Sequence, residues 1–350
     1  MRTRVHPEPR STPWLPVRIL LVVALAGGVL FAAAAPEVEI SNGLVRATIA
    51  LPDAGSGFYR GTRFDWSGVI TSLESRGHTY FGRWFKAHDP ALRDVEFRAD
   101  LDGFAAGTPS AATGPVEEFS NAIGFAEAPA GGTFVKIGVG RLRKPDEGKY
   151  AWSARYEIVD PGTWRVRPRP DAVEFEQTVG AASGYGYRYR KTVRLSKGKA
   201  ELVLEHSLRN TGRQVIETPV YSHNFLVIDG QPSGPDFAIT VPFEMPEAAD
   251  KLGILRARGR EITFLREPDK DERAMIPVAG FAADPKDYDI RVENRRTGAG
   301  VRITSDRPLA RMVVWAIRPT RCPEAFVDVR VEPGREFTWR ITYEFYTLPK

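Results

Sequence analysis

Apolar and polar residues alternate one by one along much of the chain after residue 35. Alternation with this period of two, rich in β-branched and aromatic side chains, is typical of strands with one buried face. The pattern predicts strands over residues 44–51, 133–139, 172–179, 185–195, 201–208, 215–228, 237–241, 261–265, 289–293, 300–304, 309–317, 326–331 and 336–346.

Turn-forming residues separate these runs, as in Asn210-Thr211-Gly212 and Glu332-Pro333-Gly334. No segment after residue 35 shows a long helical period of apolar residues, so helical crossovers between parallel strands are not expected. The sequence therefore predicts an all-β fold, a large antiparallel β-sandwich that residues 36–350 form as a single domain. Residues 90–132 are less regular, and we expect loops and short strands there.

The first 35 residues have the three parts of a secretory signal, which are a basic start, an apolar middle and small residues before a polar chain. Four arginines precede the apolar run, and four alanines follow it. We favour a cleaved signal peptide. The alternative is an uncleaved N-terminal anchor, because the 17 residues from 19 to 35 approach the lower limit for crossing a bilayer. Both interpretations predict an exported bacterial protein, periplasmic or extracellular, that meets a membrane only through this segment.

The net charge gives no support to a nucleic-acid partner. The whole chain carries +5, but residues 1–35 hold four Arg and one Glu, a net +3, so that residues 36–350 carry +2. No block of Lys and Arg stands out in this remainder. Cys322 is the single cysteine, which excludes an intrachain disulfide, and we expect a buried, inert thiol.

His223 lies where three polar residues, 222–224, interrupt an otherwise apolar strand. Such an interruption indicates either the end of the strand or side chains that line a cavity. A histidine titrates near neutral pH, which suits acid–base chemistry. His206, by contrast, falls on the more polar face of the strand 201–208, where we expect a surface histidine.

A glycine-bounded loop, residues 57–68, combines two arginines with several aromatic side chains. Arg60 and Arg63 can bind hydroxyl and carboxyl oxygens through two donors at once, and the ring of Trp66 can stack on the apolar face of a sugar. The loop is either a turn with exposed polar residues or a ligand-facing loop. Its aromatic residues favour the second, because exposing them all to water is unfavourable.

Glu324 follows Pro323 in a predicted turn between two of the last strands. On its own it is either a solvated acid or, with Arg318 and Arg321, part of a surface ion-pair cluster of little stability. A carboxylate from this turn and His223 from a distant strand would together form an acid–base pair.

The order of these features resembles that of the galactose mutarotase (aldose 1-epimerase-like) superfamily. The family's early arginine loop resembles residues 59–64, its His-containing strand resembles residues 221–225, and its late Glu resembles that in residues 322–324. Its Pro-Gly turn and closing Tyr-x-Phe strand resemble residues 331–334 and 342–345. The resemblance covers most of residues 38–348 and points to an exported branch of the superfamily.

This resemblance implies a large antiparallel β-sandwich and a mutarotase that opens and recloses the ring of a hexose or related sugar. It implies that His223 is the general acid, that Glu324 is the general base and that Arg63 anchors sugar hydroxyls. It implies no metal and no other cofactor. The further candidates for contact with a carbohydrate are Arg60, Trp66, Asn224, Glu118 and His78.

Two alternatives stay open on the same fold. The first is a non-catalytic carbohydrate-binding protein that uses the loop from Arg60 to Trp66 and acids such as Glu118. The second is an accessory domain of a polysaccharide lyase or hydrolase. It is the weaker alternative, because such sandwiches usually accompany a helical catalytic domain.

Overall fold

The computed structural model describes residues 34–92 and 111–349. The predicted signal or anchor therefore lies, apart from its last two residues, outside the described residues. By its internal contacts, the chain from Ala34 onward forms one compact unit. Within the described ranges, no helix combines the length and the apolar character that a bilayer span needs.

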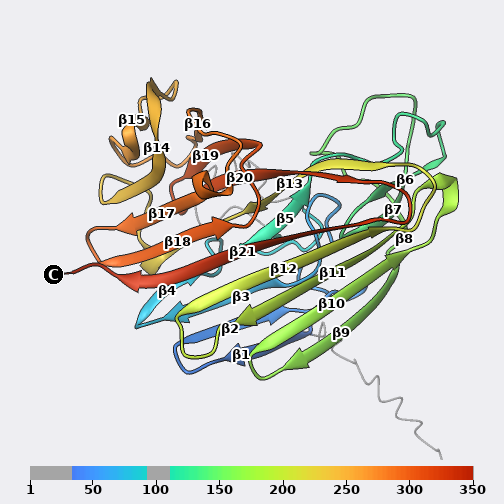
Figure 1. The fold of residues 1–350 in the computed structure, drawn as a ribbon, viewed down its shortest axis with the longest axis horizontal. Coiled ribbons are helices and arrows are strands. Elements are labelled where there is room, and N and C mark those ends of the chain that lie inside the picture. Colours follow the sequence, from blue (N-terminus) through green and yellow to red (C-terminus); the bar gives the residue numbers. More distant parts are fainter. Residues whose placement is uncertain (1–33, 93–110, 350) are drawn as a thin grey trace, which may run out of the picture. The chain divides into compact units, whose positions relative to one another are not determined.

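A nine-stranded antiparallel sheet forms one layer of this unit (Figure 1). Its strands, in spatial order, are β15 (Leu255–Phe264), β14 (Phe237–Ala249), β17 (Asp289–Asn294), β18 (Ala299–Ser305), β21 (Glu336–Thr347), β12 (Glu201–Asn210), β11 (Tyr187–Leu195), β10 (Ala172–Val179) and β9 (Thr163–Arg169).

Three smaller sheets complete the strand pairing of the described residues. The five-stranded sheet contains β16 (Ala274–Val278), β19 (Arg311–Ile317), β20 (Thr320–Val331), β13 (Ile216–His223) and β5 (Val116–Phe119). The four-stranded sheet contains β1 (Glu37–Ser41), β2 (Val45–Ala50), β3 (Val69–Ser75) and β4 (His78–Phe81). The three-stranded sheet contains β6 (Thr133–Lys136), β7 (Gly140–Arg143) and β8 (Ile158–Asp160). The short 3-10 helices are η2 (Ala182–Gly184), η3 (Ile228–Gly230) and η4 (Pro285–Asp287).

The main apolar core collects side chains from the nine-stranded sheet and from the four- and five-stranded sheets, such as Val173 of β10, Ile49 of β2 and Val314 of β19. Isolated bridges from Leu226 to Phe81 and to Arg321 connect the four-stranded sheet with the five-stranded sheet. Burial alternates along strands such as β11, as the sequence predicted. The predicted all-β, antiparallel sandwich is confirmed.

His206 is not a surface residue, contrary to the expectation from the sequence. It shares the inward face of β12 with Leu204 and Leu208 and is only 4% exposed. Its ring stacks on Trp339 with 4.4 Å between the centroids, and its Nε2 lies 3.0 Å from Oε1 of Glu117. The buried carboxylate thus gives Nε2 of the imidazole a partner, which favours histidine at this inward position.

Glu324 lies within strand β20 rather than in the predicted turn. The turn occupies residues 318 and 319, because Ile317 of β19 pairs with Thr320 of β20. The proline before Glu324 lies beyond the end of the ladder between β20 and β13. Its missing N–H therefore removes no hydrogen bond from that ladder.

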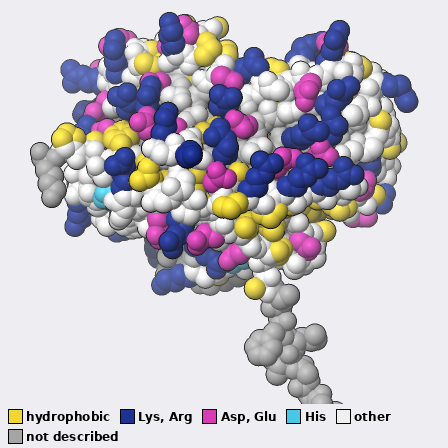
Figure 2. All heavy atoms as spheres, turned by 60° about the horizontal axis from the view of Figure 1, so that its bottom comes forward, with side chains coloured by type: hydrophobic (Ala, Val, Ile, Leu, Met, Phe, Trp, Pro, Cys, Tyr) yellow, Lys and Arg dark blue, Asp and Glu magenta, His cyan; other side chains and the backbone are white. Residues whose placement is uncertain are grey.

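Charged side chains of β9, β10 and β11 form cross-strand pairs. Arg167 of β9 lies 2.8 Å from Glu174 of β10, and Arg190 of β11 lies 2.7 Å from Glu176 of β10. On the face shown in Figure 2, Lys and Arg side chains are interspersed with Asp and Glu. Exposed pairs of this kind contribute little stability.

Candidate active site

A row of four directly opposed residues crosses the five-stranded sheet. Glu118 of β5 pairs with Tyr221 of β13, which in turn pairs with Phe326 of β20. Phe326 pairs with Arg311 of β19. Directly opposed residues project from the same side of a sheet, so these four side chains form one wall. They line a cavity of about 390 Å³ whose other lining residues are Arg63, Ser120, Tyr150, Trp152 and Glu324.

The predicted acid–base pair meets at the edge of this cavity. His223 lies two residues beyond Tyr221 on β13, and Glu324 lies two residues before Phe326 on β20. Both therefore project to the same side of the sheet as the row. Nε2 of His223 is 3.3 Å from Oε1 of Glu324. Glu324 lines the cavity, and His223 is buried directly beside it.

Aromatic rings enclose His223. Its imidazole stacks on Phe225 at 3.8 Å between centroids and meets Phe64 and Trp315 edge-on at 5.7 Å and 5.4 Å. Only 2% of the residue is exposed, and Nδ1 has no hydrogen-bond partner among the described residues. Burial, reinforced by the positive charge of Arg63, lowers the pKa of His223 well below its usual value. The imidazole is therefore neutral at pH 7.

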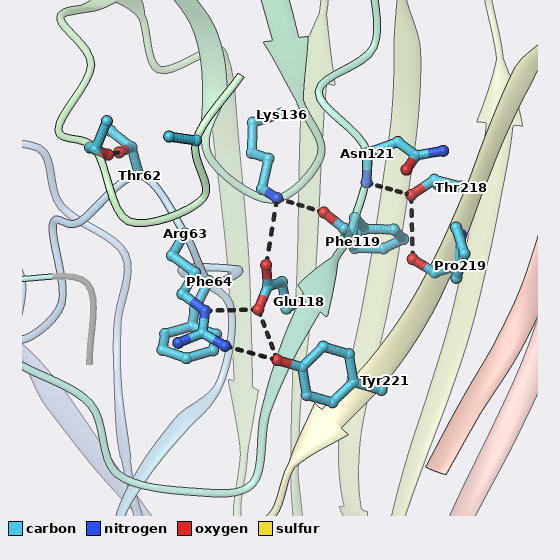
Figure 3. A network of polar contacts seen from close by, with 12 residues as sticks. Thr62, Arg63, Phe64, Glu118, Phe119, Asn121, Lys136, Thr218, Pro219 and Tyr221 are labelled. Atoms are coloured by element: carbon cyan, nitrogen blue, oxygen red, sulfur yellow. Dashed lines mark hydrogen bonds and ion pairs between the residues drawn. The ribbon is translucent and has the colours of Figure 1, made fainter. Parts of the chain in front are cut away.

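Arg63 is held by side chains from β5 and β13 (Figure 3). Its Nε donates to Oε2 of Glu118 at 2.6 Å, and its Nη2 donates to the hydroxyl of Tyr221 at 2.8 Å. That hydroxyl donates to the same carboxylate oxygen at 2.6 Å. Lys136 lies 3.8 Å from the other oxygen of Glu118 and donates to the carbonyl of Phe119. These contacts fix the guanidinium in one orientation at the cavity wall.

The charges around Glu118 decide its protonation. Burial alone would raise the pKa of Glu118, but the positive charges of Arg63 and Lys136 outweigh it and lower the pKa. Burial in turn lowers the pKa of Lys136 to about 8. Glu118 is thus an anion near neutral pH, suited to orienting Arg63 rather than to carrying a proton.

Six of the nine cavity residues were missed by the sequence analysis, namely Ser120, Tyr150, Trp152, Tyr221, Arg311 and Phe326. The ring centre of Trp152 lies 4.3 Å from Cζ of Arg63, and Trp152 is 45% exposed. Cζ of Arg311 lies 3.7 Å from the ring centre of Phe326. A large aromatic ring left exposed at a cavity offers an apolar face to a sugar ring. Trp152 lies in a turn without alternation, so no pattern in the sequence distinguished it.

Two predicted contact residues from the loop 57–68 do not line the cavity. Arg60 donates from Nη1 to the carbonyl of Gly55 at 2.7 Å. Trp66 is only 2% exposed, and its Nε1 donates to the carbonyl of Gly61 at 2.8 Å. Both side chains shape the loop that carries Arg63, and their contact with a sugar stays a prediction.

Asn224 and His78 also have partners within the protein and do not line the cavity. The amide of Asn224 donates to the carbonyl of Pro323 at 2.6 Å and accepts from the hydroxyl of Tyr343 at 2.7 Å. Nδ1 of His78 lies 3.0 Å from a carboxylate oxygen of Asp229. Their role in sugar binding likewise stays a prediction. Of the eight residues named from the sequence, the structure brings together His223, Glu324, Arg63 and Glu118.

Cys322 is buried, as expected. Among the described residues, no cluster of three or more His, Cys, Asp or Glu side chains is placed to hold a metal ion. The chemistry that the site itself offers is that of an imidazole, two carboxylates and two guanidinium groups.

Solved structures with this fold include proteins related to sugar epimerases. An aldose epimerase homologue from C. elegans has a TM-score of 0.53 and 14% identity, over 90% of this chain and 100% of that chain. A galactose mutarotase related enzyme from Lactobacillus acidophilus has a TM-score of 0.52 and 12% identity, over 90% of this chain and 99% of that chain. A putative aldose 1-epimerase from Escherichia coli K12 has a TM-score of 0.50 and 12% identity, over 89% of this chain and 99% of that chain. No family sequence model matches the chain, and comparison with curated proteins finds no match.

Proposed function

We propose, given that the chain has the galactose mutarotase-like fold, that it interconverts the anomers of a hexose or related sugar by acid–base catalysis. The observation that carries the proposal is the contact between Nε2 of His223 and Oε1 of Glu324, at 3.3 Å, beside a cavity of about 390 Å³. A cavity of that size is within the range of small-molecule sites, roughly 300–1,000 Å³.

The reaction needs one proton removed and one proton supplied. The Glu324 carboxylate takes the proton of the anomeric hydroxyl, and the electron pair left on that oxygen forms the carbonyl as the bond between C1 and the ring oxygen breaks. His223 gives its proton to the ring oxygen in the minor fraction of molecules whose imidazole is protonated, since its lowered pKa leaves most of them neutral at pH 7. Rotation about the C1–C2 bond and the reverse proton transfers close the ring as the other anomer. Acid and base groups of this kind contribute roughly 10²- to 10⁴-fold each.

Arg63 and Trp152 supply binding rather than proton transfer. The guanidinium of Arg63, oriented by Glu118 and Tyr221, presents donors for sugar oxygens. The exposed ring of Trp152 beside it presents an apolar surface. Hydroxyls and the C–H face of one sugar ring can therefore be held at the same wall as Glu324.

The test is the rate at which α-glucose and α-galactose reach anomeric equilibrium, followed by polarimetry and by exchange NMR. We expect the wild-type protein to accelerate at least one sugar, and His223→Asn and Glu324→Gln each to remove that acceleration by roughly 10²-fold or more. Glu344→Gln, at an exposed position on the outward face of β21, is the matched control and keeps the wild-type rate. A wild-type protein that accelerates no sugar, or variants that keep the full rate, would refute the proposal.

A non-catalytic carbohydrate-binding protein is the second candidate. It is favoured by the burial of His223, which keeps the imidazole neutral at pH 7 and outside the cavity lining. This candidate predicts that sugars bind with unchanged affinity to Glu324→Gln, as measured by calorimetry, while the wild-type protein leaves anomer exchange at its spontaneous rate.

Export remains part of the proposal and is supported by the basic, apolar and alanine-rich parts of residues 1–35. Fractionation of the producing cell, with N-terminal sequencing of the protein recovered outside the inner membrane, tests it. A mature chain that begins close to Pro36 supports a cleaved signal. A protein found only in the cytoplasm contradicts export.

A further inference from the structure

Two more hollows follow the cavity at Glu324, each sharing lining residues with the one before it. The next hollow has a volume of about 700 Å³ and shares Ser120 and Tyr150 with the cavity. A third hollow, of about 390 Å³, shares Gly124, Glu127 and Tyr185 with the second. The three hollows thus adjoin one another in a row that begins at the predicted acid–base pair, and this row is called the groove below. One hexose fills only its first part, because the second hollow alone has almost twice the volume of the cavity.

The lining of the second hollow suits sugar rings. Half-buried tyrosines, Tyr150 and Tyr185, lie at its two shared boundaries and add aromatic surface to the lining. The position of Tyr150 is fixed, because its ring stacks on Tyr156 at 5.5 Å and 15°. Lys144 is also fixed, since its Nζ donates to the carbonyls of Phe125 and Ala128 at 3.2 Å and 2.8 Å. Contacts within the protein thus hold two side chains of the lining, Tyr150 and Lys144, in place.

The charges of the lining favour an uncharged ligand. Three Glu and two Lys surround the second hollow, so positive and negative groups nearly balance. A chain of uronic acids would bring repeated negative charge against these carboxylates, which is unfavourable. Neutral hydroxyl groups can accept hydrogen bonds from Lys149 and donate them to the acids.

We propose that the groove binds a neutral oligosaccharide of two or more residues by its reducing end. The terminal sugar lies in the cavity, where its anomeric carbon meets Glu324, and the following residues lie in the second and third hollows. The inference rests on the proposed function, because only a reducing end presents an anomeric hydroxyl to the acid–base pair.

Calorimetry with glucose, maltose, maltotriose, cellobiose, cellotriose, laminaribiose and laminaritriose tests the proposal on the full chain. Ala126→Trp fills the second hollow from an exposed position of its lining, and Ala130→Trp places the same ring on the same loop outside all three hollows. We expect the best trisaccharide to bind wild type at least about tenfold more tightly than glucose. Ala126→Trp should remove that gain without weakening glucose, and Ala130→Trp should change neither affinity.

The outcomes separate this inference from the proposed function. Trisaccharides that bind no better than glucose, or a gain that survives Ala126→Trp, overturn the inference even where wild type accelerates anomer exchange. Two glucose molecules bound per chain, one of them lost in Ala126→Trp, show an independent small-sugar site and also overturn it. A gain lost in Ala126→Trp without any catalysis supports the groove and refutes the mutarotase.

Discussion

Glu117 and Glu118 are neighbours on β5, and their carboxylates lie on opposite faces of that strand. Glu117 points into the core, where it forms an ion pair with Lys191 and lies 3.0 Å from Nε2 of His206. Glu118 points to the cavity, where it holds Arg63. Successive side chains of a strand alternate between its faces, so one short strand supplies a carboxylate to each side.

The carboxylate of Glu117, which points into the core, depends on the positive charge of Lys191. The substitution Lys191→Met removes this charge. Glu117 and Asp65, whose Oδ2 lies 3.9 Å from Nζ of Lys191, would then be buried without that charge. We expect the free energy of unfolding, from urea denaturation, to fall by about 3–5 kcal/mol. The double variant with Glu117→Gln should recover part of the loss. A loss below about 1 kcal/mol in the single variant would contradict this role.

The outward carboxylate positions Arg63, and Glu118→Gln tests this role. Removing the negative charge leaves a buried guanidinium without its main partner, and we expect a loss of about 3 kcal/mol in unfolding free energy together with weaker sugar binding. Tyr221→Phe deletes only a hydroxyl and should cost about 1–2 kcal/mol. Unfolding curves and calorimetry give both quantities. Equal effects of the two variants, or unchanged sugar affinity in Glu118→Gln, would count against positioning.

Replacing Trp152 by alanine should lower sugar affinity but not stability, whereas replacing Trp66 by alanine should lower stability. Trp152→Ala removes an exposed ring, so stability should change by no more than about 0.5 kcal/mol while sugar affinity falls. Trp66→Ala empties a buried site and should cost about 3–5 kcal/mol of unfolding free energy. Denaturation and binding isotherms on the same preparations separate the two effects. Full sugar affinity in a folded Trp152→Ala would remove this residue from the site.

The lowered pKa of His223 sets the expected pH dependence. As a general acid the imidazole must be protonated, and burial and Arg63 lower its pKa well below the usual value. The rate should therefore fall as pH rises through a value below about 6.5, the ordinary histidine pKa. NMR titration of the imidazole and the pH profile of kcat/KM should report the same group. A profile that is flat from pH 5 to 7 would contradict acid catalysis by His223.

Local patterns were sufficient to predict the strands with one buried face. The range 172–179 coincides with β10, because Val173, Phe175 and Val179 face the core while residues such as Glu174 and Glu176 between them are more exposed. β5 gave no such signal, since all four of its residues are buried. Its two acids are compensated by cations that lie far away in the sequence, at positions 63 and 191. No local window contains both partners, so the strand could not be predicted.

The sequence pointed to those site residues whose type by itself indicates acid–base chemistry. A histidine and a late acid, His223 and Glu324, were paired correctly in space although Glu324 was placed in a turn. The tryptophans could not be distinguished in this way. Trp66 and Trp152 have the same chemistry, and only tertiary packing leaves the second exposed.

In the row Glu118–Tyr221–Phe326–Arg311, the spacing of the strands fixes the distances between the four side-chain positions. Adjacent strands are held roughly 4.8 Å apart by their hydrogen bonds, so four consecutive positions span about 14 Å whatever side chains they carry. A substitution in the row changes the side chain at one position without moving the other three positions. Under the proposed function, specificity for different sugars is therefore altered one strand at a time, while the spacing between the four positions stays constant.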